Sequence, residues 1–201
     1  MPRPTADIDE VRGAHQRLHQ SVVGLDEATI RRPSGLPGWS VGHVLSHLAR
    51  NADSIVRRLE AAEQGKHVEQ YVGGAQGRAD EIERGASRSA ASIVDDVIAS
   101  NERVERTFDR VSPDVWDRPV AAGAAVSRLV VASHLASARW CEVEIHHVDL
   151  GLGYRAADWS DELVDRMLPR MLKALPSRCD RRDLLGWTLG RAGAPLLGPW
   201  S

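Results

Sequence analysis

The sequence has few cysteines, few aromatic residues and no long apolar run, and each shortage excludes a class of protein. Cys141 and Cys179 are its two cysteines and no C-x-x-C spacing occurs, so a disulfide framework and a thiolate zinc cluster are both disfavoured. No stretch approaches the roughly 18 uninterrupted apolar residues of a membrane span, and no apolar segment follows a charged start as in a signal peptide. These absences predict a cytoplasmic protein in a reducing compartment.

An excess of charge of one sign is also missing. The chain carries 26 basic and 28 acidic residues among 201, which gives a formal net charge of -2. The broad positive field that attracts nucleic acid or an anionic membrane is therefore absent, and we expect neither as a partner. Aromatic residues make up only 4% of the chain, so the core is expected to be aliphatic.

Apolar residues recur at helical spacing in four long segments, and no segment shows the alternation of a strand. The periodicity predicts helices over residues 5–24, 41–64, 78–110 and 127–150, with a candidate break at 85–87. Glycine and proline predict loops over residues 66–77 and 119–125, and shorter helices are expected over 161–175 and 180–191. We therefore predict an all-α four-helix bundle over residues 1–155 and a short helical C-terminal extension over residues 156–201.

Two of the predicted long helices carry side chains that can ligate a metal ion. His43 and His47 lie four residues apart in the second helix, and Glu142 and His146 lie four residues apart in the fourth. Each pair therefore shares one helix face. A single pair of this kind is more often helix surface or a hydrogen-bonded core histidine than a metal site.

Position around the fourth helix favours Glu142 and His146 over their neighbours. Their face also holds Val131, Leu135 and Ala138, so it is expected to turn into the bundle and to bury Glu142. A buried carboxylate needs a partner, which can be an arginine or a cation shared with histidines. The opposite face is expected to be exposed to solvent, and it holds Ser133, Ser137, Trp140, Glu144 and His147.

His47 lies at the edge of the apolar stripe of the second helix, where a polar pocket between helices can form. Together with Glu142 and His146 it would supply two nitrogens and one oxygen, a set that suits Zn²⁺ or another divalent metal with one open position. His43 is left as a supporting group, a fourth ligand or an exposed side chain. Asp149 either accepts the imidazole N–H of His146 or has a capping or solvent-facing role.

The sequence offers no convincing protein nucleophile. Cys141 has no evident base partner and is assigned to the core, as are His134 and Cys179. The G-x-S-x-G, P-loop, dinucleotide-binding and H-E-x-x-H motifs are all missing or in the wrong context.

Two segments, PGWSVGHVLSHLA at 37–49 and EVEIHHVDL at 142–150, resemble motifs of the mycothiol-dependent maleylpyruvate isomerase family within the DinB/YfiT-like metalloproteins. The resemblance covers residues 5–155 and implies a four-helix bundle with a divalent metal, usually zinc, on His47, Glu142 and His146. Members of that family continue into a C-terminal α/β domain with strands. Here the closing segment DLLGWTLGR at 183–191 is similar to that domain's last helix, but the strand-rich part is missing.

The resemblance also implies an enzyme that uses mycothiol as a thiol cosubstrate. A metal-activated thiolate would add to an electrophilic small molecule, giving either thiol S-transfer or thiol-assisted cis-trans isomerisation of the maleylpyruvate type. Arg78, beside the glycine-rich loop, and Arg191, matched to an arginine of the family's C-terminal domain, are candidate contacts for mycothiol. The alternative is a non-catalytic DinB-like stress protein that binds a metal or a small ligand. The oligomeric state, a homodimer included, is left open.

Overall fold

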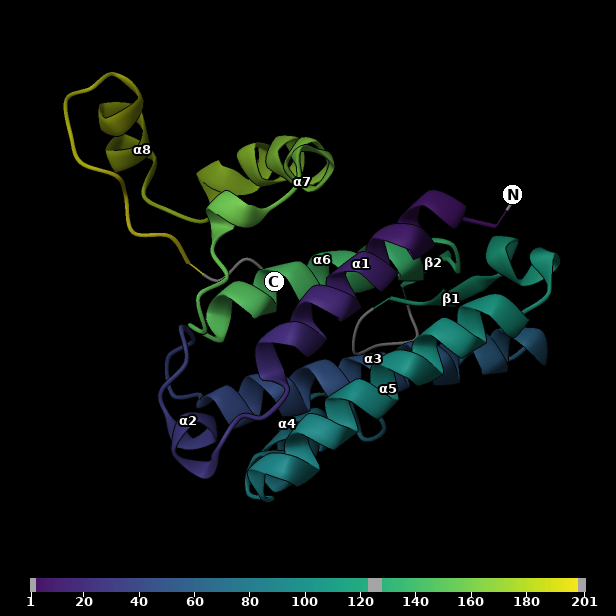
Figure 1. Cartoon of the computed structure of the whole chain (residues 1–201). Helices are drawn as coiled ribbons and strands as arrows, with labels where there is room; N and C mark the ends of the chain where they lie inside the picture. Colours follow the sequence, from purple (N-terminus) through teal and green to yellow (C-terminus); the bar gives the residue numbers. More distant parts are fainter. Residues whose placement is uncertain (1–2, 123–127, 199–201) are drawn as a thin grey trace. The chain divides into compact units, whose positions relative to one another are not determined.

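The computed structural model describes residues 3–122 and 128–198, and the predicted helix start at Ser127 lies outside these ranges. The chain divides into two compact units, Met1–Ala156 and Ala157–Ser201. Four long helices form the first unit: α1 (Thr5–Val22), α3 (Val41–Glu63), α5 (Ala90–Arg110) and α6 (His134–Asp149). Helix α1 packs against α5 and α6, and α3 packs against the same two helices, so the four close into a bundle (Figure 1). The predicted all-α fold class is confirmed.

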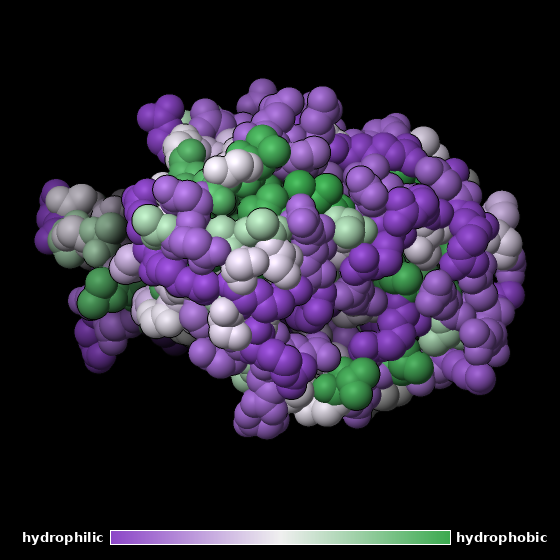
Figure 2. Space-filling model, turned by 60° about the horizontal axis from the view of Figure 1, so that its bottom comes forward, coloured by the Kyte–Doolittle hydropathy of each residue, from purple (hydrophilic) through white to green (hydrophobic). Residues whose placement is uncertain are grey.

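The inner faces of the four helices are mainly aliphatic, as the composition predicts, and the aromatic side chains of Phe108 and Trp140 are buried among them. Fully buried side chains along the bundle include Ile8, Leu18, Leu45, Leu48, Ile55, Leu59, Ile93 and Phe108. Burial of a side chain of this size contributes about 1.5–3 kcal/mol, so this stripe-to-stripe packing stabilises the helices. The face drawn in Figure 2 is covered mainly by hydrophilic residues, with hydrophobic residues in small groups between them.

Polar side chains cap three of the helices in the first unit. Asp26 accepts a hydrogen bond from Thr29 N at the start of the short helix α2 (Glu27–Arg31), which lies in a region without a helix prediction. Ser40 caps α3, and Ser89 caps α5 by accepting from Ser92 N. The predicted break in the third helix is confirmed, because α4 (Gly74–Ala86) ends just before Ser87.

Two local predictions are wrong. Helix α4 begins at Gly74, inside the predicted loop 66–77. Strand β1 (Pro119–Ala121) pairs antiparallel with β2 (Leu129–Val131), in segments predicted as loop and helix, and their register places Val120 opposite Val130. Each strand has only three residues, which is too few to show the alternation of apolar and polar side chains that marks a strand in a sequence. The pairing itself joins two separate segments, so neither segment predicts it alone.

The burial of α6 also differs from the prediction. Val131 lies in β2 and is 45% exposed, and Glu142 is partly exposed, whereas Glu144 and His147 on the expected solvent face are buried. Ser137 and Trp140 of the same face are buried as well. The physical reason is that α1 covers this side of α6: Arg17 donates a hydrogen bond to Glu144, and Ser21 bonds His147 at 2.8 Å. Helix α6 is therefore enclosed on two sides rather than one.

The second unit contains α7 (Asp161–Ala174) and α8 (Arg181–Thr188), joined by the 3₁₀ helix η3 (Leu175–Ser177). Two further 3₁₀ helices, η1 (Pro113–Asp117) and η2 (Ala156–Asp158), occur earlier in the chain. Ser160 and Asp180 cap α7 and α8 by accepting backbone N–H groups. Helix α7 ends at Ala174, one residue before its predicted end, and α8 ends at Thr188, three residues before the predicted end at Arg191. Across the described residues no helix combines the length and the apolar character needed to cross a membrane.

Candidate metal centre

The bundle brings His47, Glu142 and His146 together from α3 and α6. Their ligand-type atoms all lie within 4.8 Å of one another, and no other such group of three occurs within residues 3–122 and 128–198. Glu142 Oε2 is 3.2 Å from His47 Nε2 and 3.4 Å from His146 Nε2. The two imidazole rings meet edge to face, with centroids 4.7 Å apart. Both imidazoles thus point their Nε2 atoms at one carboxylate oxygen.

Each side chain is fixed by the helix that carries it. Ser40 and His43 form a capping box at the start of α3, in which the Ser40 side chain accepts from the backbone of His43. This cap sets the first turn of α3, and His47 follows one turn later. Glu142 and His146 are four residues apart on α6, so their side chains stand one above the other on the face that meets α3.

The three groups hold one another in defined protonation states. Burial lowers the pKa of His47 to about 4, although Glu142 opposes the shift, so His47 is neutral at pH 7. Burial alone would lower the pKa of His146 too, but hydrogen bonds to Asp149 and Glu142 raise it to about 9. Burial would raise the pKa of Glu142, yet hydrogen bonds from His146 and His47 outweigh it and keep this pKa well below the ordinary value.

Asp149 lies directly behind His146. Its Oδ2 is 2.7 Å from His146 Nδ1, the ring nitrogen that faces away from Glu142. Of the two roles left open for Asp149, this geometry matches acceptance of the imidazole N–H. A carboxylate in that position fixes which nitrogen of a histidine carries the proton and leaves the other one for a metal.

A glycine- and proline-rich loop places Trp39 beside the cluster. Ser34 N donates to Trp39 O at 2.8 Å, and Gly35 N donates to the backbone of Asp149 at 2.7 Å, so the loop is tied to the end of α6. A Cβ at Gly35 would lie 3.4 Å from the Asp149 backbone, which shows how closely the loop approaches the end of α6. The Trp39 ring consequently stands edge-on to His47, with centroids 5.7 Å apart.

The other candidate site residues lie in different surroundings. His43 bonds Ser40 at 2.7 Å in the cap of α3 and Glu83 on α4 at 3.0 Å, and it is not part of the His47, Glu142 and His146 cluster. Arg78 donates from Nη2 to His47 Nδ1 at 3.2 Å. Arg191 lies after α8 in the second unit, and its role stays a prediction.

None of the three residues assigned to the core, His134, Cys141 and Cys179, is fully buried. His134 is exposed at the start of α6, because the hairpin strand β2 precedes it where a longer helix was expected. Cys141 and Cys179 are both half-buried thiols outside any disulfide.

Sequence reasoning missed the buried arginines of the bundle. Arg139 on α6 is fully buried and donates to Leu48 O at 2.9 Å, to Asn51 Oδ1 at 2.8 Å and to Asn101 Oδ1 at 2.6 Å, with His15 Nε2 at 3.2 Å as a fourth acceptor. Burial lowers the pKa of Arg139 to about 10, so it remains charged at neutral pH. The sequence does hold a signal for this buried arginine: polar residues occupy core-facing positions on α1, α3 and α5, where they can accept its hydrogen bonds.

Arg58 on α3 is a second buried guanidinium. It donates to Ser54 O and Ser54 Oγ and, at 3.0 Å, to Ala121 O in β1. Glu142 raises the pKa of both Arg58 and Arg139 through its charge, although burial lowers both pKa values overall. The ionised carboxylate of the cluster is therefore also a counter-charge for two arginines inside the bundle.

Two nitrogens and one oxygen converging from two helices form a donor set that suits zinc or another divalent metal. A site with three protein ligands keeps one coordination position open, which is the arrangement of catalytic sites. The residues present therefore fit a divalent cation.

Comparison with known proteins identifies the family. The model of the mycothiol maleylpyruvate isomerase N-terminal domain matches residues 11–151. A crystal structure of the mycothiol-dependent maleylpyruvate isomerase is similar at 27% identity and a TM-score of 0.75, and that of a histidine-to-alanine mutant at 26% and 0.75. In both cases the match covers 84% of this chain and 68% of the other. No curated protein matches. Since the family model spans more than two thirds of the sequence, the chain belongs to the mycothiol maleylpyruvate isomerase N-terminal domain family, as its motifs predict.

Proposed function

We propose that this protein is a mycothiol-dependent isomerase of the maleylpyruvate type, and that it works with a divalent cation, zinc by preference, held by His47, Glu142 and His146. One observation carries the proposal: the ligand-type atoms of the three side chains lie within 4.8 Å of one another. His47 on α3 and Glu142 on α6 are 95 residues apart in sequence, so the fold brings them together. Membership of the isomerase family supports it independently.

A bound divalent cation would lower the pKa of a thiol from its ordinary value near 8.5, so that the thiolate is available at neutral pH. The residues of the chain supply the holding and orienting groups. His47 and His146 present Nε2 atoms, Glu142 presents Oε2, and Asp149 accepts the Nδ1–H of His146 and fixes its ring.

The reaction then needs only the thiol of the cosubstrate as its nucleophile. The thiolate sulfur forms a bond to one carbon of a conjugated alkene, and the π electron pair moves onto the conjugated carbonyl oxygen. The former double bond rotates as a single bond, after which the electron pair returns and expels the thiolate unchanged. Thiol S-transfer would share the first step but retain the carbon–sulfur bond. Arg78 is proposed to contact the substrate or the cosubstrate beside His47, and Arg191, in the second unit, stays a predicted contact for mycothiol.

Metal content is the first test. We expect about one zinc per chain in protein purified without chelator, and loss of the metal in His47→Ala and Glu142→Ala, because either change removes a ligand. The matched control is His134→Ala, which removes an exposed histidine from the same helix as Glu142. Full zinc occupancy in both ligand variants, measured by elemental analysis, would refute the site.

The reaction is tested by incubating the zinc-loaded protein with mycothiol and either maleylpyruvate or a panel of activated alkenes, epoxides and halides. Mass spectrometry and chromatography of the products separate the outcomes. Isomerised substrate with mycothiol regenerated supports the proposal, and an S-conjugate would assign a transferase instead. Neither product in the presence of bound zinc would favour the non-catalytic alternative.

A further inference from the structure

Arg78 is held at the edge of the metal centre by two aromatic rings. Its guanidinium carbon lies 5.7 Å from the ring centroid of Trp39 and 5.6 Å from that of Tyr71. Cations stack favourably on aromatic faces, and arginine does so through its flat guanidinium. The turn before Arg78 is tight, because a Cβ on Gly77 would overlap Val72 O at 1.9 Å. Helix α4 therefore delivers Arg78 to a defined place.

The hydrogen bond between Arg78 and His47 has only one direction. A guanidinium has five N–H donors and no acceptor, so Arg78 Nη2 donates and His47 Nδ1, 3.2 Å away, accepts. Since Nδ1 accepts, the ring proton of His47 lies on Nε2, which donates to Glu142 Oε2 at 3.2 Å. Among the described residues, His47 is the one hydrogen-bond partner of Arg78, and no carboxylate pairs with it.

That arrangement conflicts with metal ligation by the same histidine. His47 Nε2 is the atom directed at Glu142, and it can bind a cation only through its lone pair. The ring proton must then reside on Nδ1, where it faces an N–H of Arg78 instead of accepting from it. Two donors cannot bond each other, and the guanidinium also carries the same sign of charge as the metal.

We propose that Arg78 is an exchangeable partner of the centre: it holds His47 while the site is free of metal, is displaced from His47 when the cation binds, and then recognises a carboxylate of the substrate. Trp39 and Tyr71 do not oppose this displacement, because their rings contact the flat face of the guanidinium and leave its N–H groups free to change partner. The released N–H groups match a carboxylate in a two-pronged geometry. This inference rests on the proposed function, and it specifies an electrophile that bears a carboxylate.

Zinc affinity, measured by competition with a chromophoric chelator, tests the exchange without relying on activity. Arg78→Met keeps an apolar stem between the rings but removes the donors and the charge. We expect it to bind zinc about tenfold more tightly than the wild type, since no hydrogen bond to Nδ1 must break and no like charge remains. The control is Arg84→Met, which removes an exposed arginine from the same helix and should leave zinc affinity unchanged.

Carboxylate recognition is tested by calorimetric titration of the zinc-loaded proteins with maleate. The wild type and Arg84→Met should bind maleate, and Arg78→Met should bind it at least tenfold more weakly. Unchanged or weaker zinc binding by Arg78→Met would overturn the exchange, and unchanged maleate binding would overturn the recognition step. The proposed function would survive either of these two results, provided that the wild type binds zinc and isomerises maleylpyruvate. Failure of the wild type to bind zinc would overturn both.

Discussion

His15 should make the stability of the bundle depend on pH in a predictable way. It lies on α1, with 3% of its surface exposed, between a carboxylate of α5 and the guanidinium of α6. Its Nδ1 is 2.8 Å from Glu105 Oε1, and its Nε2 accepts from Arg139 Nε at 3.2 Å. A second proton would have to enter at Nε2, displace the Arg139 donor and place two cations side by side. Burial above all lowers the pKa of His15 to about 4.

The sign follows from the protons bound in each state. Between pH 6.5 and pH 4 the unfolded chain holds a proton on His15 that the folded protein does not, so stability falls as the pH falls through this range. The stability that neutral His15 contributes is fully present above pH 6.5, the pKa of the histidine in the unfolded chain. Going from pH 7 to about pH 4.5 should cost about 2 kcal/mol from this residue alone.

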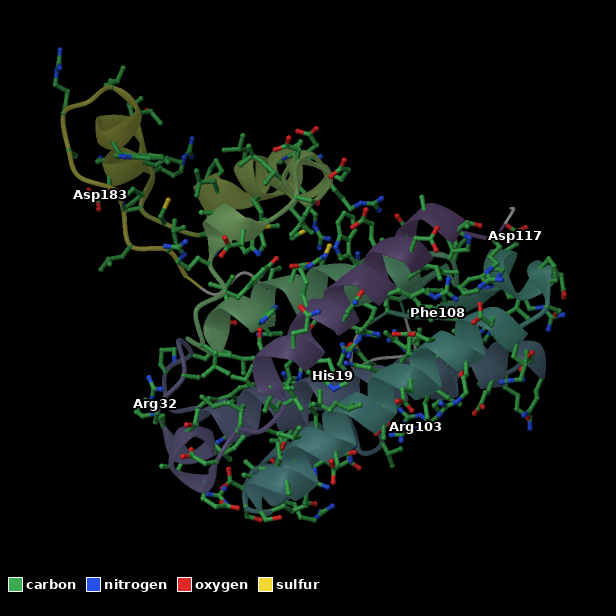
Figure 3. The ribbon with its side chains drawn as sticks, viewed as in Figure 1. His19, Arg32, Arg103, Phe108, Asp117 and Asp183 are labelled. Carbon is green, nitrogen blue, oxygen red and sulfur yellow. The ribbon has the colours of Figure 1, made fainter. Side chains whose placement is uncertain are left out.

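The comparison that isolates His15 uses His15→Gln. Glutamine can still donate to Glu105 and accept from Arg139, but it does not titrate. We expect urea unfolding to show the wild type losing about 2 kcal/mol more than His15→Gln over that pH range. His19→Gln removes an exposed histidine one turn away on α1 and serves as the control (Figure 3). Charged neighbours such as Arg12 and Glu102 line the adjoining cavity of about 310 Å³ and are common to all three proteins. Parallel pH profiles for the wild type and His15→Gln would refute the reasoning.

Two further substitutions distinguish the candidate metal centre from the other buried groups of α6. Asp149→Asn should weaken zinc binding roughly 10- to 100-fold without unfolding the bundle, because the carboxylate that orients His146 is lost; unchanged affinity in a chelator competition would contradict this role. Glu144→Gln should leave zinc content unchanged but lower the free energy of unfolding by about 1–3 kcal/mol, since buried Glu144 accepts from Arg17 and Tyr154; zinc loss in this variant, with normal stability, would argue against the assignment of Glu142.

The helices of the bundle could be predicted because their signals are local. Ser40 before the apolar stripe of α3 and the glycine at 85 each act within one helical turn. The β1–β2 hairpin could not be predicted in the same way, because its stability comes from pairing across a connection and from Val120 packing into the core. The start of α6 was placed too early for the same reason.

The candidate site was found by residue type and spacing, although one premise was wrong. The helical pattern predicts that Glu142 is more buried than Glu144, yet Glu144 is the deeper of the two. Glu144 is stabilised there by Arg17 from α1, a contact that depends on how α1 lies on α6. Spacing nevertheless places Glu142 and His146 together, because residues four apart on a helix share a face whichever face it is.

The sequence by itself determined the helical segments, the aliphatic core and the family, since periodicity, capping residues and the two motifs are properties of short segments. Only the tertiary structure decided which faces of α6 are buried, that Arg139 lies in the bundle interior with acceptors from three helices, and that Arg78 meets His47. These features depend on side chains that are 31 to 124 residues apart in sequence. Distances of that kind are set by helix packing, which no local pattern encodes.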